Sequence, residues 1–198
     1  MPTGAIAASP AVLTSRPMNI TLESPGDRQD IEKLLDLAFG ADRVGKTVYR
    51  LRDGVPPIDA LGTVIRESGI LRGSLRFWPI VIGQERAPAL LLGPVAVAPA
   101  DRGKGYARAL IWDGLARARE LGYRIVLLVG DEPYYGQFGF ARAKAERLEL
   151  PGPVDPARLL GLELEAGALD GVAGMVARAM PGEARPVRCG PRSGLLAS

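Results

Sequence analysis

The segment 89–129 constrains the fold of this chain more than any other. In it an apolar strand, a glycine-containing loop, a long helix and a second apolar strand follow one another without a gap. Helical spacing predicts a helix over 102–121, with Gly122 at the left-handed position that ends many helices. The apolar face of this helix is Ala107, Leu110, Ile111, Leu115, Ala118 and Leu121. The continuous apolar run at 125–129 is typical of a strand buried on both faces.

The flanking segments add further strands and helices. Alternating residues predict a short strand at 18–23, and strands at 61–67 and 70–82 form a hairpin that turns at Ser68-Gly69. One helix is expected after residue 27, and a second helical stretch carries Val44, Val48 and Leu51. Weaker patterns at 147–150 and 159–165 indicate two more strands. The expected fold is α/β, of the mixed α+β kind, with one central, mostly antiparallel sheet and flanking helices.

The residue counts exclude several kinds of chemistry. Histidine is absent from all 198 residues, and Cys189 is the single cysteine. Ser-His-Asp catalysis, histidine-ligated metals, an internal disulfide and a cysteine-built zinc site are therefore excluded, and we expect no metal. The net charge of +3 comes mostly from arginines scattered singly among acids, whereas nucleic-acid-binding proteins concentrate positive charge in runs or stripes. We expect no nucleic-acid partner.

The loop before the long helix has the features of a phosphate site. The first amides of a helix lack intrahelical partners and carry partial positive charge, which acidic residues usually balance. Here Arg102, Lys104 and Arg108 stand there instead, and they would repel the helix dipole unless an anion lies among them. Gly103 and Gly105 carry no side chain that would block such a ligand.

Two known nucleotide-binding patterns are alternatives to this phosphate site. The dinucleotide fingerprint fails at its third glycine, where Arg108 stands. The segment 40–47 (GADRVGKT) matches G-x-x-x-x-G-K-[ST], but a P-loop must directly follow a buried strand, and residues 31–39 have helical periodicity. A nucleotide-binding P-loop protein is thus the less favoured interpretation, and a connection between two helices the favoured one.

Three motifs in order resemble the GNAT superfamily of acyl-CoA-dependent N-acyltransferases. Residues 102–107 (RGKGYA) match its R/Q-x-x-G-x-G/A pyrophosphate motif. Residues 95–99 stand where the family keeps its core strand, and residues 135–140 match its Tyr-x-x-x-Gly-Phe element. Residues 130–135 further resemble the YhbS-like N-acetyltransferases. The resemblance covers residues 18–143 and implies a single GNAT-like domain.

The resemblance implies that acetyl-CoA is the co-substrate. Its pantetheine arm would pair with amides of the bulged strand, and its pyrophosphate would lie on the glycine loop. The residues so implied are Val95, Ala96, Val97, Arg102, Gly103, Lys104, Gly105, Tyr106, Ala107 and Arg108. The sequence offers independent support, because Gly93-Pro94 marks a bulge inside an apolar strand. Such a bulge would splay this strand from 125–129 and leave backbone groups free for the ligand.

The resemblance also makes Tyr135 the general acid that protonates the departing thiolate, with Tyr134 as the alternative. A phenol with a pKa near 10 stays protonated at neutral pH, as this role requires. The strand at 89–97 has no titratable side chain that could act as general base. The nearest carboxylates are Glu67, Glu85, Asp131 and Glu132.

We therefore expect an acetyl-CoA-dependent N-acetyltransferase in which an amine attacks the thioester directly, without a covalent enzyme intermediate. The amine-bearing acceptor is a small molecule or an amine of a peptide or protein, and its pocket is expected around 41–53 and the C-terminal strands. The alternative is a non-catalytic acyl-CoA sensor, because the strand lacks a carboxylate. The sequence leaves open whether the protein assembles as a homodimer.

The organisation along the chain follows from these segments. We expect a flexible leader at 1–17, the acetyltransferase domain at 18–150, an extension at 151–180 that completes the sheet or the acceptor site, and a loose basic tail at 181–198. The longest uncharged run, 87–100, contains prolines and is too short to cross a bilayer. The leader lacks the basic start of a signal peptide, so we expect a cytoplasmic protein with no membrane partner.

Overall fold

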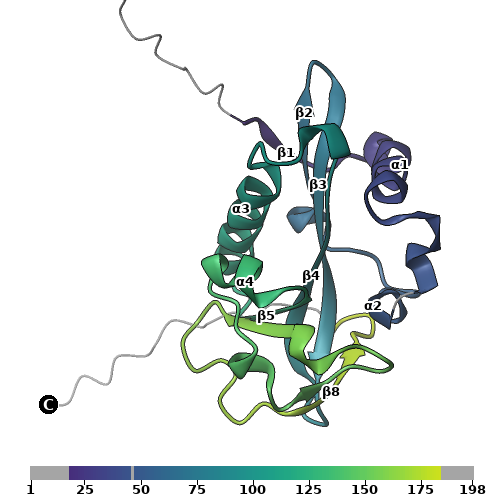
Figure 1. Cartoon of the computed structure of the whole chain (residues 1–198). Coiled ribbons are helices and arrows are strands. Elements are labelled where there is room, and N and C mark those ends of the chain that lie inside the picture. Colours follow the sequence, from purple (N-terminus) through teal and green to yellow (C-terminus); the bar gives the residue numbers. More distant parts are fainter. Residues whose placement is uncertain (1–17, 46, 184–198) are drawn as a thin grey trace, which may run out of the picture.

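A computed structural model describes residues 18–45 and 47–183, so the predictions for the leader, Lys46, Cys189 and the tail from 184 onward lie outside the described residues. One twisted sheet has helices on both faces (Figure 1). The helices are α1 (Arg28–Phe39), α2 (Thr47–Arg50), α3 (Tyr106–Glu120) and α4 (Glu132–Tyr135). The strands are β1 (Ile20–Leu22), β2 (Thr63–Glu67), β3 (Ile70–Ile82), β4 (Ala87–Val97), β5 (Ile125–Val129), β6 (Leu148–Glu149), β7 (Leu159–Glu163) and β8 (Gly174–Arg178).

The strand order confirms the predicted mixed, mostly antiparallel sheet. The strands lie in the order β1-β2-β3-β4-β5-β7, and β8 pairs with β3 and with β6. On the main path only β4 and β5 run parallel. The hairpin of β2 and β3 turns at Ser68 and Gly69, both at positive φ, as the sequence predicted. Within the described residues, no helix has the length and apolar character needed to cross a membrane.

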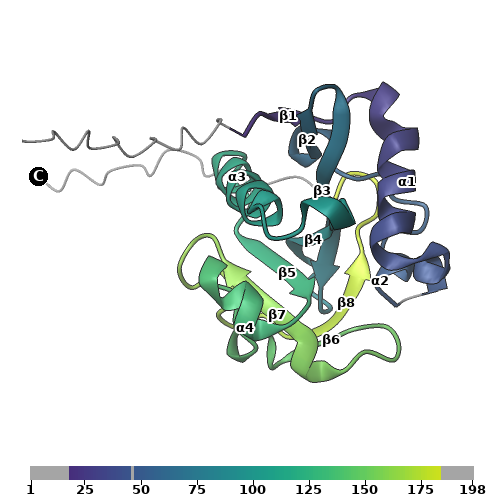
Figure 2. The ribbon, with the colours of Figure 1, turned by 45° about the horizontal axis from the view of Figure 1, so that its top comes forward.

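Two helices cover opposite faces of this sheet (Figure 2). The apolar face of α3 packs with Leu75 and Phe77 of β3, while α1 packs with Ala96 of β4 on the other face. At Gly114 the helix lies so close to β3 that a β-carbon there would come within 2.7 Å of the Phe77 ring. This close packing holds α3 against β3.

β4 and β5 diverge like the arms of a V, as predicted. They pair only at Leu90–Val126 and Leu91–Leu127. Beyond Leu91, β4 contains Gly93 at a φ of 113° and the cis Gly93–Pro94 peptide. The register against β3 shifts at this point, which is the expected bulge. Residues of β4 after the bulge therefore have no strand partner on their β5 side.

The structure corrects several predicted boundaries. The helix predicted over 102–121 begins only at Tyr106, because Gly103 and Gly105 adopt positive φ values that an α-helix does not contain. The second helical stretch is a 3₁₀ turn, Ala41–Gly45, followed by the short α2. β6 and β7 are shorter than the patterns at 147–150 and 159–165 suggested, and β8 was not predicted.

Candidate active site

The backbone of β4 presents free donors to the gap between β4 and β5. The amide of Ala98 donates to the carbonyl of Arg72 at 2.8 Å, so Ala98 faces β3. Because amides alternate in direction along an antiparallel strand, Ala96 also points its amide at β3, while Val95 and Val97 point theirs into the gap. Ala96 buries its side chain under α1. The gap thus offers two amides, those of Val95 and Val97, to an amide-bearing ligand.

The glycine loop lies directly after this strand and opens α3. Gly105 is the N-cap of the helix at a φ of 83°, and Gly103 has a φ of 84°. A β-carbon on Gly103 would meet no atom within 4 Å, so open space lies over the loop. The amide of Ala109 donates to the Gly105 carbonyl at 3.0 Å. Amides 106–108 therefore precede the helical ladder and remain available to an anion.

The three cations of the loop are not equivalent. The ammonium of Lys104 lies 2.6 Å from Oδ1 of the buried Asp101, whose other oxygen lies 3.4 Å from Arg72. The hydrogen bond from Lys104 lowers the pKa of Asp101. Lys104 is thus already balanced by a carboxylate, contrary to the expectation that all three cations await an anion. Among the described residues, the exposed Arg102 and Arg108 form no ion pair.

Tyr106 and Ala107 are the first residues of α3, and Tyr106 is placed by packing. Tyr106 is buried, and its hydroxyl donates to the carboxylate of Glu67 at the end of β2. Its side chain therefore holds the start of the helix against the sheet rather than facing the loop. Its contribution to anion binding is limited to its backbone amide.

Tyr135 stands at the far side of the gap, at the end of α4. Its ring packs over the α-carbon of Gly130, and together with Leu92, Pro94 and Val129 it lines a cavity of about 530 Å³. Burial raises the pKa of Tyr135 to about 12, and the nearby Tyr134 and Asp131 add to the shift. The hydroxyl is therefore protonated at neutral pH, which suits a proton donor.

Tyr134 lies differently from its neighbour. It is 42% exposed and meets the rings of Tyr135 and Phe138 edge-on, at centroid distances of 4.9 and 5.8 Å. It does not line the cavity that contains Tyr135. Adjacent helical residues point in directions about 100° apart, so only Tyr135 faces the gap.

The carboxylates singled out from the sequence lie away from this cavity. Glu67 bonds Tyr106, and Glu85 lies in the turn between β3 and β4 at another cavity. Asp131 is exposed and pairs with Arg158 at 3.2 Å, while the Glu132 carboxylate accepts from the Arg142 amide. Of these, only Asp131 lies near Tyr135, and its side chain is paired with Arg158 and does not line the cavity. No cluster of metal-binding side chains occurs in the described part of the chain.

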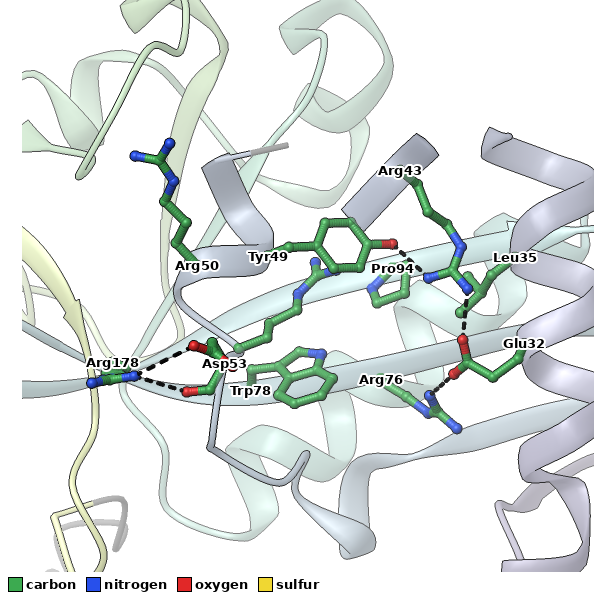
Figure 3. A pocket seen from close by; sticks show the side chains of 11 residues that line it. Glu32, Leu35, Arg43, Tyr49, Arg50, Asp53, Arg76, Trp78, Pro94 and Arg178 are labelled. Atoms are coloured by element: carbon green, nitrogen blue, oxygen red, sulfur yellow. Dashed lines mark hydrogen bonds and ion pairs between the residues drawn. The ribbon is translucent and has the colours of Figure 1, made fainter. Parts of the chain in front are cut away.

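Sequence reasoning missed the arginine-rich wall opposite Tyr135. A second cavity, of about 710 Å³, adjoins the first and shares with it Arg43, Tyr49, Arg52 and Pro94. Trp78 of β3 and Arg76 also line it (Figure 3). The region around 41–53 was expected to form a pocket, but no local pattern identified Arg52 or Trp78, because they meet only through the fold.

Comparison with known proteins agrees with the geometry of the gap and the loop. The profile of the acetyltransferase (GNAT) domain matches residues 20–143. The chain is 33% identical over 160 residues to the uncharacterized N-acetyltransferase YhbS of Escherichia coli (strain K12), covering 80% of this chain and 95% of YhbS.

Two crystal structures are similar over most of their length. One is the GNAT family N-acetyltransferase YhbS from Escherichia coli in complex with CoA, with a TM-score of 0.71 and 32% identity, covering 82% of this chain and 89% of that one. The other is a GNAT family acetyltransferase from Brucella melitensis in complex with acetyl-CoA. Its TM-score is 0.62 at 31% identity, covering 82% of this chain and 96% of that one.

Proposed function

Because this chain belongs to the GNAT acetyltransferases, we propose that it binds acetyl-CoA between β4 and β5 and transfers the acetyl group to an amine. The observation that carries this proposal is that β4 and β5 stop pairing after Leu91, directly before the bulge. The amides of Val95 and Val97 then face an open gap. The CoA and acetyl-CoA complexes of the two similar proteins support this choice of ligand.

The binding mode follows from the free donors. The pantetheine arm, which carries amides, pairs with the two β4 amides in place of the missing strand. The pyrophosphate lies over Gly103 and Gly105, where the first amides of α3 and the charges of Arg102 and Arg108 meet it. This orientation brings the thioester to the bulge and to Tyr135.

The chemistry is a direct transfer. A neutral amine attacks the thioester carbonyl carbon, forming a C–N bond, while a donor amide of β4 stabilises the charge on the oxygen. The C–S bond breaks, the thiolate takes the Tyr135 proton, and the acetylated nitrogen releases its extra proton to water. Tyr135 then regains a proton from solvent. The carboxylates near the gap already have partners, so an amine that arrives deprotonated fits this site best.

The carboxylates that line the two cavities near Tyr135 are already engaged, which favours one alternative. Glu32 is held by Arg43 and Arg76, and Asp155 accepts from the Ala157 amide. A chain with this loop and no base would serve as an acyl-CoA sensor, which binds the ligand without turning it over.

Two measurements on the purified protein test the proposal. Ligand binding raises the melting temperature by mass action, so CoA should raise it and ATP should not. Thiol release from acetyl-CoA in the presence of primary amines then separates the enzyme from the sensor. A CoA-induced shift without amine-dependent thiol release would favour the sensor, and the absence of a CoA-induced shift would contradict both.

A further inference from the structure

The wall opposite Tyr135 is built mainly from arginines, and most of them are balanced. Arg43 is buried and contacts Glu32 at 2.6 Å and Asp36 at 2.9 Å. Arg76 is buried too, and it contacts Glu23 at 2.6 Å and Glu32 at 3.2 Å. Figure 3 shows Glu32 between these two guanidinium groups. The charges of Arg43 and Arg76 are therefore balanced by carboxylates of the protein itself.

Arg50 and Arg52 are the exceptions, because among the described residues neither has a carboxylate partner. Arg50 is exposed and reaches only the Pro151 carbonyl, at 3.5 Å, whereas Arg52 lines both cavities. The guanidinium carbon of Arg52 lies 4.7 Å from the ring centroid of Tyr49 and 5.7 Å from that of Trp78. Its Nε is buried without a hydrogen-bond partner, and within the described residues no carboxylate pairs with it. Burial lowers the pKa of Arg52 to about 10, Tyr49 opposes this, and the charges of Arg43 and Arg76 add to it. Arg52 therefore stays charged at neutral pH.

Arg52 is half-buried, with its Nε enclosed and unpartnered, and a partly desolvated cation without a counter-ion is costly, so an anion from outside would complete the arrangement. Arg52 lines both cavities, and it shares the smaller one with Tyr135, Leu92 and Pro94. A β-carbon on Gly93 would lie 3.7 Å from its terminal nitrogen, which places the guanidinium beside the bulge. An anion on Arg52 would thus lie beside the bulge, in the cavity that contains Tyr135.

The geometry points to an acceptor that is a small primary amine bearing a carboxylate, with Arg52 as the residue that binds the carboxylate and so determines specificity. This inference rests on the proposed function. A guanidinium and a carboxylate form a bidentate pair. In the smaller cavity Arg43 and Arg158 are paired with carboxylates, so the single unbalanced charge of Arg52 matches a singly charged anion better than a phosphate. The rings of Tyr49 and Trp78 line the same cavity beside Arg52 and would offer apolar contacts to the carbons between the amine and the carboxylate (Figure 3).

The test uses primary amines in matched pairs, each amino acid beside its carboxamide: glycine and glycinamide, β-alanine and β-alaninamide, phenylalanine and phenylalaninamide. Thiol release from acetyl-CoA gives kcat/KM for each. A charge-assisted hydrogen bond contributes about 1.5–3 kcal/mol, so we expect a preference of about 10- to 100-fold for the carboxylates. In Arg52→Met the ratio of kcat/KM between carboxylate and carboxamide should fall to near one. Arg52→Lys keeps the charge but loses the bidentate geometry of the guanidinium, so it should retain part of the preference.

The controls separate this inference from the function on which it rests. Arg28→Met makes the same exchange at an exposed position of α1 and should leave the preference unchanged. The CoA-induced rise in melting temperature, measured on each variant, shows whether the variant is folded and whether its CoA site is intact. Equal use of amides and carboxylates, an unchanged preference in Arg52→Met, or no turnover of any carboxylate while CoA still binds would overturn the inference alone. Loss of CoA binding in the parent protein would overturn both.

Discussion

The ring of Tyr135 lies directly on the α-carbon of Gly130, where a β-carbon would come within 2.2 Å of its Cε2 atom. Gly130 directly follows β5 and Tyr135 ends α4, so the absence of a side chain at one position sets the place of the phenol at the other. Aromatic atoms cannot yield in the way that the end of a flexible side chain can. Any larger residue at 130 must therefore move the ring.

Gly130→Ala should lower turnover by moving Tyr135 out of the gap. A misplacement of about 1 Å can cost about 100-fold in rate, so we expect a loss of about 10- to 100-fold, with the CoA-induced melting shift retained. The matched control is Gly136→Ala, because a β-carbon on Gly136 would meet nothing within 4 Å. Equal turnover in the two variants would argue against a role for the ring's position.

Tyr135→Phe should reduce kcat by about 100-fold, the low end for a positioned acid, because a thiolate is already a fair leaving group. CoA affinity should change little, since the ring remains. Tyr134→Phe should cost much less, because Tyr134 is exposed and does not line the cavity. A larger loss in Tyr134→Phe would transfer the role to that residue.

Stability at high pH should depend on Tyr135. A free tyrosine has a pKa near 10, and burial raises the pKa of Tyr135 to about 12. A raised pKa in the folded state means that its contribution is fully present below pH 10 and is lost as the pH rises toward 12. The melting temperature of the wild type relative to Tyr135→Phe should therefore fall across this range. A difference that does not change with pH would contradict the burial of the hydroxyl.

Gly105→Glu should abolish the CoA-induced melting shift, because it places a carboxylate where the pyrophosphate is proposed to lie. Gly105 has a φ of 83°, so any side chain there is also strained. Gly105→Ala carries that strain without the charge and should keep part of the shift. Lys46→Ala, in the segment that resembles a P-loop, should leave the shift intact. The opposite pattern would move the phosphate site to residues 40–47.

The described part of that segment contradicts a P-loop. Gly40 ends α1, and residues 41–45 form a 3₁₀ turn. The segment thus follows a helix, whereas a P-loop follows a buried strand. Helical periodicity before Gly40 was sufficient to predict this from the sequence.

Local patterns predicted the parts of the site that the backbone builds. The Ser68-Gly69 turn, the buried strand β5 and the bulge at Gly93-Pro94 were identified because turn chemistry, periodicity and proline placement act over a few residues. The glycine loop was predicted for the same reason. Only the start of α3 was misplaced, where two glycines at positive φ delay the helix to Tyr106.

The sequence by itself therefore determined the order of elements up to β7, the bulge and the glycine loop, while the choice of Tyr135 came from the family resemblance and stays a prediction. The tertiary structure alone decided that Lys104 is balanced by Asp101, that Gly130 positions Tyr135, and that Arg52 lies between Tyr49 and Trp78 without a carboxylate. The physical reason is the separation along the sequence of the residues that interact. Periodicity records which face of an element is buried, but the balance of a charge depends on side chains that distant segments bring to it, such as Glu23 and Glu32 beside Arg76.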